Sequence, residues 1–257
     1  MNALVTGGTG ALGHEVVAEL RSAGHRARVL SRKPGTGGDW AQGDLASGAS
    51  LDRALEDIEV IVHAASAAAQ PWRLHATDVV GTRRLIEAAA RAHVKHLVFI
   101  SIVGMEGVAY PYYTRKLEAE KVVREGSLPW TILRATKFHA SIDFFLSRFC
   151  SIPGLAMVPL AWQFQPVDAR EVARRLTELA LGPPAGRVPD FGGPEVRTFR
   201  SLAESWLKAR RQNRRLVNLP IPFAFSGQFA AGKLLVPEHK DGTVKFEQYL
   251  VRKYGRW

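Results

Sequence analysis

Short apolar runs alternate with segments of helical periodicity along the first half of the chain. Runs typical of strands occur at residues 2–6, 26–31, 40–45, 60–64, 96–101 and 130–134. Apolar residues recur at helical spacing in residues 11–23, 51–57, 72–93 and 113–124. Strands that alternate with helices predict an α/β fold with a doubly wound parallel sheet of the Rossmann type.

The alternation weakens after residue 134, where we expect a smaller lobe. Residues 135–164 are rich in Phe and Trp, and residues 183–257 hold scattered prolines and one clear helical pattern, at 198–211. Residues 165–182 have the pattern of a strand end and a helix that rejoin the main sheet. We therefore expect a Rossmann domain of residues 1–134 with 165–182, and a small C-terminal lobe of residues 135–164 and 183–257.

The composition is that of a globular protein. Of 257 residues, 46% are hydrophobic and 23% are charged, which disfavours a disordered or collagen-like chain. The single cysteine, Cys150, cannot form an internal disulfide, which favours a reducing compartment. No stretch approaches the roughly 20 apolar residues of a membrane span, and the first residues lead into a strand rather than a secretory signal. We expect a cytoplasmic protein without a transmembrane segment.

The net charge of +11 lies almost entirely in the second half of the chain. Residues 1–130 carry 15 Lys and Arg against 14 Asp and Glu, whereas residues 131–257 carry 20 against 10. The densest run, 208–215, follows a predicted helix, where cations also complement the helix dipole. The excess indicates a solvated basic face, which we favour, or a surface for an anionic partner such as nucleic acid.

Glycines follow the first predicted strand in the string Thr6-Gly-Gly-Thr-Gly-Ala-Leu-Gly13. The dinucleotide pattern fits in two registers, one with Gly8 and one with Gly7, each followed by Gly10 and Gly13. In both, glycine permits a tight turn and the close approach of a pyrophosphate, whose charge rests on the N-terminus of the next helix. Because a strand precedes the string and a helix follows it, we predict a dinucleotide cofactor.

The end of the second strand distinguishes NAD from NADP. An acidic residue there would bind the ribose hydroxyls of NAD, but this chain has Ser31-Arg32-Lys33. Two cations suit the 2′-phosphate of NADP, which an Arg can hold by two charge-assisted hydrogen bonds. We therefore expect NADP(H), with two solvated surface charges as the alternative. Asp44 and Leu45 are placed to meet the adenine, although a turn-capping Asp explains the position nearly as well.

Tyr112 and Lys116 stand four residues apart at the start of a predicted helix, so both side chains share one face. A Tyr hydroxyl can protonate a carbonyl oxygen as hydride arrives, and a neighbouring ammonium favours the phenolate that remains. Lys116 could also hold the nicotinamide ribose. The pair follows the fifth strand, and the carboxyl ends of parallel strands are where such sites form.

Several segments together resemble one family. They are the glycine string, Asp78-Val-Val-Gly-Thr82, Ile100-Ser-Ile-Val-Gly104, Tyr112-Tyr-Thr-Arg-Lys116, Leu128–Thr136, Phe164–Asp168 and Gly192–Glu195. They are similar to the atypical, extended short-chain dehydrogenases/reductases of the NmrA-like, NAD(P)H-binding group, over nearly the whole chain. The resemblance implies a Rossmann domain with a substrate lobe, Tyr112 as proton donor and Lys116 as the ribose-binding residue. It also implies the glycine register that begins at Gly7.

The chain departs from the well-characterised reductases at one point. Those enzymes resemble one another in a Ser or Thr some two dozen residues before the Tyr, whose hydroxyl polarises the carbonyl. Here Ser101 lies only eleven residues before Tyr112, and the position two further on is Val103. Ser101 is our candidate for orienting the carbonyl, and a strand-end Ser that bonds its own backbone is the alternative.

In this fold the residues after the sixth strand line the nicotinamide side, which places Thr136, Phe138 and His139 near the reacting centre. We interpret His139 as a structural hydrogen-bonding group. The aromatic residues between 138 and 164 form either a pocket for a quinone or aromatic carbonyl compound or the core of the small lobe. We favour the core for Phe144, Phe145 and Phe149. No His pair stands at metal-ligand spacing together with a carboxylate or a thiol, so we expect no metal.

Two functions fit these features. The first is an NADPH-dependent oxidoreductase that reduces a quinone-like or carbonyl small molecule by hydride transfer, with Tyr112, Lys116 and Ser101 as catalytic residues. The alternative is a non-enzymatic NADP(H)-binding redox sensor or regulatory protein with a basic partner-binding lobe. The expected cofactor contacts are Gly7, Thr9, Gly10, Ala11, Leu12, Gly13, Ser31, Arg32, Lys33, Asp44, Leu45, Ala64, Ala65, Lys116, Thr136 and Phe138.

Overall fold

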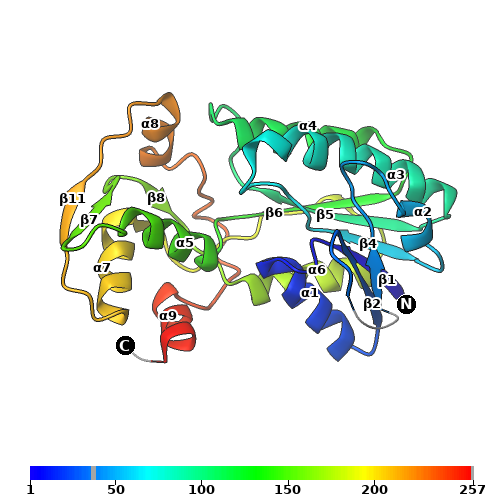
Figure 1. The fold of residues 1–257 in the computed structure, drawn as a ribbon, viewed down its shortest axis with the longest axis horizontal. Helices are drawn as coiled ribbons and strands as arrows, with labels where there is room; N and C mark the ends of the chain where they lie inside the picture. The colour runs from blue at the N-terminus through cyan, green and yellow to red at the C-terminus, as the bar shows by residue number, and fades with distance from the viewer. Residues whose placement is uncertain (36–38, 256–257) are drawn as a thin grey trace. The chain divides into compact units, whose positions relative to one another are not determined.

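A computed structural model describes residues 1–35 and 39–255 (Figure 1). The strands are β1 (Asn2–Thr6), β2 (Arg26–Ser31), β3 (Trp40–Gln42), β4 (Val60–His63), β5 (His96–Ile102), β6 (Trp130–Ala135), β7 (Leu155–Val158), β8 (Gln163–Phe164), β9 (Gly186–Arg187), β10 (Arg197–Thr198) and β11 (Arg215–Asn218). The helices are α1 (Ala11–Ser22), α2 (Leu51–Ala54), η1 (Pro71–Arg73), η2 (His75–Val80), α3 (Gly81–Arg91), α4 (Pro111–Glu125), α5 (His139–Phe149), α6 (Ala169–Leu181), α7 (Phe199–Ala209), α8 (Ala224–Ala230) and α9 (Phe246–Tyr254).

The contacts divide the chain into two compact units. Unit 1 consists of Met1–Ser101, Tyr110–Arg134 and Val172–Pro189. Unit 2 consists of Ile102–Ala109, Ala135–Glu171 and Asp190–Trp257. The short loop of residues 102–109 therefore groups with unit 2 by its contacts, although along the chain it connects β5 with α4.

Unit 1 is built on one seven-stranded sheet. The strand order is β3-β2-β1-β4-β5-β6-β9. Strands β2 and β3 are added on one side of β1, and β4, β5, β6 and β9 are added on the other side, so the order of addition reverses between β1 and β4. The paired strands run parallel, with Val5 in register with Val29 on one side and Val62 on the other. Helices α3 and α4 cover one face of the sheet, and α1 and α6 cover the other (Figure 1). The predicted doubly wound α/β fold is confirmed.

Burial of both faces explains why these strands are apolar throughout. All four residues of β4 are buried. Leu97 and Phe99 of β5 belong to the same core cluster as Leu85 of α3 and Val123 of α4. Because apolar surface removed from water stabilises by roughly 25 cal/mol per Å², this two-sided burial stabilises the sheet.

The helix expected at residues 72–93 is divided into three pieces. Pro71 begins the short 3-10 helix η1, the π-helical turn η2 follows, and α3 starts only at Gly81. A π-turn shifts the register of the helix by one residue and leaves the apolar spacing almost unchanged. The sequence pattern therefore could not distinguish the irregular start from a continuous helix.

The core of unit 2 is aromatic. Trp162 lies 4.7 Å from Phe229 and 6.2 Å from Phe199 between ring centroids, and Phe164 lies 5.2 Å from Phe199. These rings therefore belong to the core of the unit. Phe144 is 57% exposed, which contradicts the core interpretation for that residue. Phe144 sits on the outer face of α5, whose inner face is formed by Ile142 and Leu146.

A buried carboxylate joins three helices of unit 2. Asp143 of α5 accepts hydrogen bonds from Trp206 Nε1 (2.6 Å) and Tyr254 OH (2.7 Å) through Oδ1. Its Oδ2 accepts from Tyr249 OH and from the Lys253 ammonium. Although burial raises the pKa of Asp143, these donors hold it below its ordinary value.

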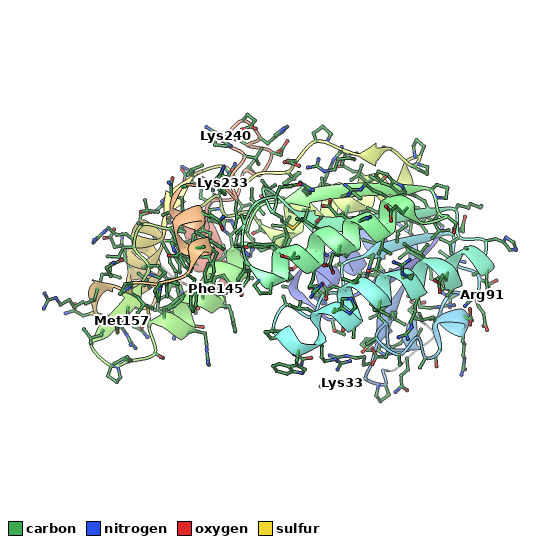
Figure 2. All side chains as sticks on the ribbon, turned by 90° about the horizontal axis from the view of Figure 1, so that it is seen from above. Lys33, Arg91, Phe145, Met157, Lys233 and Lys240 are labelled. Carbon is green, nitrogen blue, oxygen red and sulfur yellow. The ribbon has the colours of Figure 1, made fainter. Side chains whose placement is uncertain are left out.

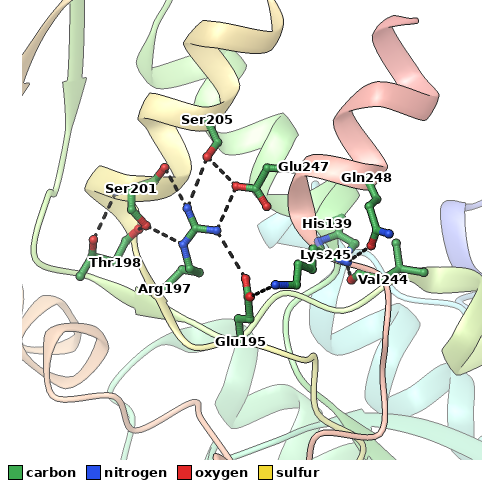
Figure 3. A network of polar contacts seen from close by, with 10 residues as sticks. All are labelled: His139, Glu195, Arg197, Thr198, Ser201, Ser205, Val244, Lys245, Glu247 and Gln248. Atoms are coloured by element: carbon green, nitrogen blue, oxygen red, sulfur yellow. Dashed lines mark hydrogen bonds and ion pairs between the residues drawn. The ribbon is translucent and has the colours of Figure 1, made fainter. Parts of the chain in front are cut away.

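A second polar network joins α7 to α9 (Figure 3). Arg197 bonds the Glu247 carboxylate at 3.0 Å and the Ser201 hydroxyl at 2.9 Å, and Glu195 pairs with Lys245 at 2.5 Å. With Asp143, this network ties the last described helix into unit 2. Among the described residues, none of the helices is both long and apolar enough to cross a bilayer.

Unit 1 also contains a buried ion pair. Arg134 of β6 bonds Glu120 of α4 through both carboxylate oxygens, at 2.7 and 2.8 Å, and the Glu120 side chain is fully buried. Arg124 approaches the same carboxylate at 3.7 Å from a half-exposed position. Burial raises the pKa of Glu120, and the neighbouring donors and positive charges, with the Arg134 hydrogen bonds foremost, together keep it below the ordinary value.

We predict that Arg134→Met lowers the free energy of unfolding by about 3 kcal/mol, because it leaves a buried carboxylate without its principal partner. Arg124→Met is the matched control and should cost less than about 1 kcal/mol, since an exposed ion pair contributes little. Urea unfolding followed by circular dichroism measures both. Equal losses of unfolding free energy in the two variants would show that the buried bidentate pair stabilises the protein no more than the exposed pair does.

Candidate functional site

Unit 1 contains a cavity of about 700 Å³ at the carboxyl ends of β1, β2, β3 and β4. The order in which strands are added to the sheet reverses between β1 and β4, and ligands of open α/β sheets bind at such a switch point. The cavity is lined by Thr6, Gly7, Thr9, Gly10, Leu30, Ser31, Arg32, Lys33, Pro34, Trp40, Gly43, Asp44, Leu45, Ala64, Ala65, Ser66, Ala67, Ala69, Gln70 and Thr77. Its size and position suit a nucleotide.

The turn between β1 and α1 is packed against the end of β4. Gly7 has φ +70°, and a Cβ there would lie 2.7 Å from the Ala64 carbonyl oxygen. A Cβ at Gly13 would lie 2.2 Å from the Gly7 carbonyl oxygen. Both distances are shorter than a Cβ contact allows, and the clashing atoms are backbone. Steric crowding therefore requires glycine at positions 7 and 13, which are the first and last glycines of the register that begins at Gly7.

The N-terminus of α1 faces this turn without a side-chain cap. Gly10 is the N-cap residue, no side chain bonds the first N–H groups, and the first turn holds no acidic residue. Unsatisfied N–H groups and the helix dipole favour a bound anion. The turn, the free helix end and the cavity together fit the pyrophosphate of a dinucleotide. Ala11, Leu12 and Gly13 lie in the first turn of α1, next to the lining residues Thr9 and Gly10.

The residues after β2 form another part of the cavity wall. Arg32 and Lys33 both line the cavity with exposed side chains, and Lys33 lies at the edge of unit 1 (Figure 2). Within residues 1–35 and 39–255, neither cation forms an ion pair. Ser31 Oγ accepts from the Lys33 N–H at 3.1 Å, and Trp40 Nε1 donates to the Lys33 carbonyl at 2.9 Å. These bonds hold the loop that carries the two cations.

Asp44 has protein partners beside the cavity. Its Oδ1 accepts from the Ala46 N–H at 2.9 Å, and its Oδ2 meets Arg73 at 3.3 Å. Asp44 therefore caps a turn, which was the alternative interpretation, and also lines the cavity. Leu45 is buried beside it and contributes its apolar surface to the wall.

A buried chain of hydrogen bonds joins β1 and β4 to the start of α3. Thr6 Oγ1 lies 2.6 Å from His63 Nδ1, and His63 Nε2 lies 2.9 Å from Thr82 Oγ1. Thr82 Oγ1 donates to the Asp78 carbonyl, so it accepts the proton of His63 Nε2. His63 Nδ1 then accepts from Thr6. The chain is complete only with a neutral His63, and burial together with the Lys116 charge lowers the pKa of His63 to about 3.

The carboxylate of Asp78 holds the loop that follows β4. It accepts from Ser66 Oγ at 2.7 Å and from the Ala67 N–H at 2.8 Å, and both residues line the cavity. Asp78 is 2% exposed. Its negative charge also offsets part of the burial that lowers the pKa of Lys116. The buried Asp78 carboxylate therefore holds a loop of the cavity wall and also favours the charged form of Lys116.

Tyr112 and Lys116 lie one turn apart at the start of α4. Tyr112 is half-buried, whereas its neighbour Tyr113 is 1% exposed and burial raises the pKa of Tyr113. The Lys116 ammonium is buried and lies 4.2 Å from the centroid of the Phe99 ring. Burial lowers the pKa of Lys116, and Asp78 and Glu120 act in the opposite direction.

Ser101 ends the buried part of β5 and is 3% exposed, with its Oγ shielded from solvent. This burial favours a structural role over contact with a substrate carbonyl. Thr136 and Phe138 belong to unit 2. The Thr136 hydroxyl accepts from the Gly193 N–H at 3.2 Å, and Phe138 precedes α5 as its N-cap residue. His139 Nε2 donates to the Val244 carbonyl at 2.9 Å, which supports its structural interpretation.

Three residues of the site were not predicted as functional. Asp78 begins the segment Asp78-Val-Val-Gly-Thr82, which resembles the family, but its carboxylate accepts hydrogen bonds from residues eleven and twelve positions earlier in the chain. His63 ends an apolar strand, where a polar residue in a buried run was the available signal. Trp40 starts the short strand β3. Among the residues that the structure describes, no three His, Cys, Asp or Glu side chains are grouped as metal ligands.

The fold and the cavity define a dinucleotide-binding α/β protein. The model of the NAD(P)H-binding family matches residues 7–141, and the chain belongs to that family, among the atypical extended short-chain dehydrogenases/reductases. The crystal structure of a short-chain dehydrogenase/reductase superfamily protein from Agrobacterium tumefaciens with bound NAD has the same fold. Its TM-score is 0.75 at 21% identity, over 99% of this chain and 96% of that one.

Two relatives differ in the roles that their names state. The (4-alkanoyl-5-oxo-2,5-dihydrofuran-3-yl)methyl phosphate reductase of Streptomyces griseus is 32% identical over 248 residues, which cover 92% of this chain and 81% of that enzyme. The photosystem II assembly factor Ycf39 of Trieres chinensis is 28% identical over 169 residues, which cover 62% of this chain and 52% of that protein. The chain thus matches only about half of the assembly factor.

We predict that His63 makes the protein less stable in acid. Its pKa is lower in the folded protein than in the unfolded chain, so the unfolded chain takes up the proton first. The contribution is complete above about pH 6.5 and is lost as the pH falls toward 3, at up to about 1.4 kcal/mol per pH unit. His63→Gln should flatten the dependence of unfolding free energy on pH between 6 and 4. His75→Gln, at an exposed position, is the control, and equal slopes in all three proteins would contradict the prediction.

Proposed function

We propose that the protein is an NADPH-dependent reductase that acts on a carbonyl or quinone-like small molecule. The observation that carries the proposal is the Lys116 ammonium, which is buried over Phe99 one helical turn from the half-buried Tyr112. A buried cation with no carboxylate in an ion pair among the described residues is costly unless it serves a ligand. Ribose hydroxyls are ligands of the required kind.

Tyr112 and Lys116 divide the work of proton transfer. When bound, a nicotinamide cofactor supplies the hydride with its electron pair. The carbonyl carbon of the substrate receives the hydride and the carbonyl oxygen receives the Tyr112 proton, so an alcohol and the oxidised cofactor result. The ammonium of Lys116 stabilises the phenolate that remains on Tyr112 until solvent returns the proton. Tyr113 is unsuited to this role because burial raises its pKa.

One relative supports a reductase whose substrate bears carbonyl groups. The Streptomyces griseus enzyme is a reductase, and the name of its substrate describes an alkanoyl-substituted furanone, which bears carbonyl groups. That enzyme matches 92% of this chain. The preference for NADPH over NADH rests on Arg32 and Lys33, which line the cavity and form no ion pair among the described residues. A 2′-phosphate would supply the missing negative charge.

A second function is favoured by one comparison. The photosystem relative is named as an assembly factor, and the excess of 10 positive charges in residues 131–257 would suit an anionic partner. In that case the protein binds NADP(H) and acts as a regulatory or assembly protein without turnover. Oxidation of NADPH with a carbonyl or quinone compound separates the reductase from this function.

We predict that purified protein oxidises NADPH with a panel of quinones and aromatic or furanone carbonyl compounds. Tyr112→Phe should lower turnover at least about a hundredfold, because the phenol is the proton donor. Tyr110→Phe is the matched control and should keep its turnover, since Tyr110 is more exposed and precedes the helix. Absence of turnover on every compound, in protein that binds NADPH, would refute the reductase and favour the regulatory function.

We predict that Arg32→Ala weakens NADPH binding by ~1.5 to 3 kcal/mol and leaves NADH binding nearly unchanged, because only NADPH carries the 2′-phosphate. Lys33→Ala should act in the same direction with a smaller loss, since Lys does not bond phosphate through two parallel hydrogen bonds. Titration of each cofactor by the change in protein fluorescence measures the dissociation constants. Equal losses for both cofactors in Arg32→Ala would exclude the NADPH preference.

A further inference from the structure

We propose that Trp40 is a positioning residue for the selection of NADPH over NADH, because its indole holds the loop of residues 31–35. The proposal rests on the proposed function, in which Arg32 and Lys33 of this loop bind the 2′-phosphate. All of these residues belong to unit 1, and Trp40 lines the same cavity as the two cations. Trp40 acts on the cofactor through the loop that presents these cations.

The two cations need a fixed backbone if they are to bind a phosphate selectively. Arg32 and Lys33 are exposed, and neither forms an ion pair within residues 1–35 and 39–255. Long side chains lose rotamer freedom when they hold an anion. A backbone that had to become ordered at the same time would add to this entropic cost, so a loop that is ordered beforehand binds the phosphate more tightly.

The Trp40 indole holds the loop in two ways. Its Nε1 donates a hydrogen bond to the Lys33 carbonyl at 2.9 Å. Gly35 packs against the ring so closely that a Cβ at Gly35 would lie 2.1 Å from Trp40 Cδ2 and 2.2 Å from Cε2. One rigid side chain therefore fixes the loop by a hydrogen bond at Lys33 and by direct contact two residues later.

Strand β3 determines where the indole lies. It pairs with β2 in parallel, with Gln42 in register with Ser31. Side chains two residues apart in a strand share one face, so Trp40 and Gln42 point the same way. Gln42 Nε2 donates to the Arg32 carbonyl at 3.3 Å. The carbonyls of Arg32 and Lys33 are therefore both held by side chains from one face of β3.

The sequence of the loop restricts its backbone further. Pro34 follows Lys33, and a proline has a fixed φ and disfavours the helical conformation of the residue before it. Ser31 Oγ accepts from the Lys33 N–H at 3.1 Å. The Lys33 carbonyl therefore belongs to a stretch with few alternative conformations, among which the hydrogen bond from Trp40 selects one.

The test compares the binding of adenosine 2′,5′-bisphosphate and adenosine 5′-monophosphate to the full chain by isothermal titration calorimetry. The two nucleotides differ only in the 2′-phosphate. Trp40→Phe keeps an aromatic ring and loses the N–H donor. We expect it to weaken binding of the bisphosphate about five- to tenfold, which is the effect of one or two neutral hydrogen bonds. Binding of the monophosphate should stay within about twofold.

Gly35→Ala is the second variant, because it leaves Trp40 and both cations in the chain. The added Cβ would overlap the indole, so the loop and the ring must separate. We expect the same selective loss of bisphosphate binding as in Trp40→Phe.

Trp72→Phe is the matched control, because Trp72 belongs to the same unit and is 79% exposed. It should bind both nucleotides as the wild type does. The proposal would be overturned by equal losses for the two nucleotides in Trp40→Phe. Unchanged binding of the bisphosphate in both Trp40→Phe and Gly35→Ala would overturn it as well.

A double-mutant cycle separates positioning from direct contact with the ligand. A positioning residue acts only through the groups that it positions, so the effect of Trp40→Phe should disappear in the Arg32→Ala/Lys33→Ala background. A loss of bisphosphate binding that keeps its full size without the two cations would show that Trp40 contacts the nucleotide itself, and would exclude the positioning role.

These measurements require no turnover, so they can be distinguished from the test of the reductase. If the wild type binds both nucleotides equally, the preference for NADPH and the role of Trp40 both fail. If the wild type prefers the bisphosphate and Trp40→Phe keeps the full preference, only the role of Trp40 fails. A selective loss in Trp40→Phe, in a protein that reduces nothing, would support the role of Trp40 and refute the reductase.

Discussion

The close passage of two backbone segments at the end of β1 is the constraint on which the cofactor cavity depends. The β1–α1 turn meets the Ala64 carbonyl at Gly7 and the first turn of α1 at Gly13, and neither position has room for a Cβ. This contact draws the N-terminus of α1 to the ends of β1 and β4, where the strand order reverses. The free N–H groups of α1 thereby reach the cavity, so a steric requirement produces an electrostatic site.

Buried polar groups stabilise this arrangement because each is matched to a partner. Thr6, His63 and Thr82 form one continuous chain of donors and acceptors across the sheet, and Asp78 secures the loop beside it. Lys116 adds a buried positive charge next to them, which helps to keep His63 neutral. The negative charges of Asp78 and Glu120 in turn oppose the loss of the Lys116 proton. The charges of Asp78 and Lys116 therefore act both on the polar groups of the cavity wall and on the catalytic candidate.

Unit 2 is organised differently, with polar ties between helices around an aromatic core. Asp143 receives four donors from α7 and α9, and the Arg197 network joins the same helices through Glu247. The loop of residues 102–109 belongs to this unit by its contacts, although it connects Ser101 to the start of α4.

The sequence by itself determined the sheet, its helices and the position of the phosphate turn. These features depend on apolar periodicity and on glycine spacing, both of which act over a few residues. It also indicated Arg32, Lys33, Tyr112 and Lys116, because their chemistry is recognisable at fixed offsets from strands. Only the tertiary structure decided which distant groups meet. Thr6 and His63, Asp143 and Tyr254, and Ala109 and Gln228 are separated by 57, 111 and 119 residues. No local pattern records such pairs, since the folded chain brings them together through packing that involves the whole unit.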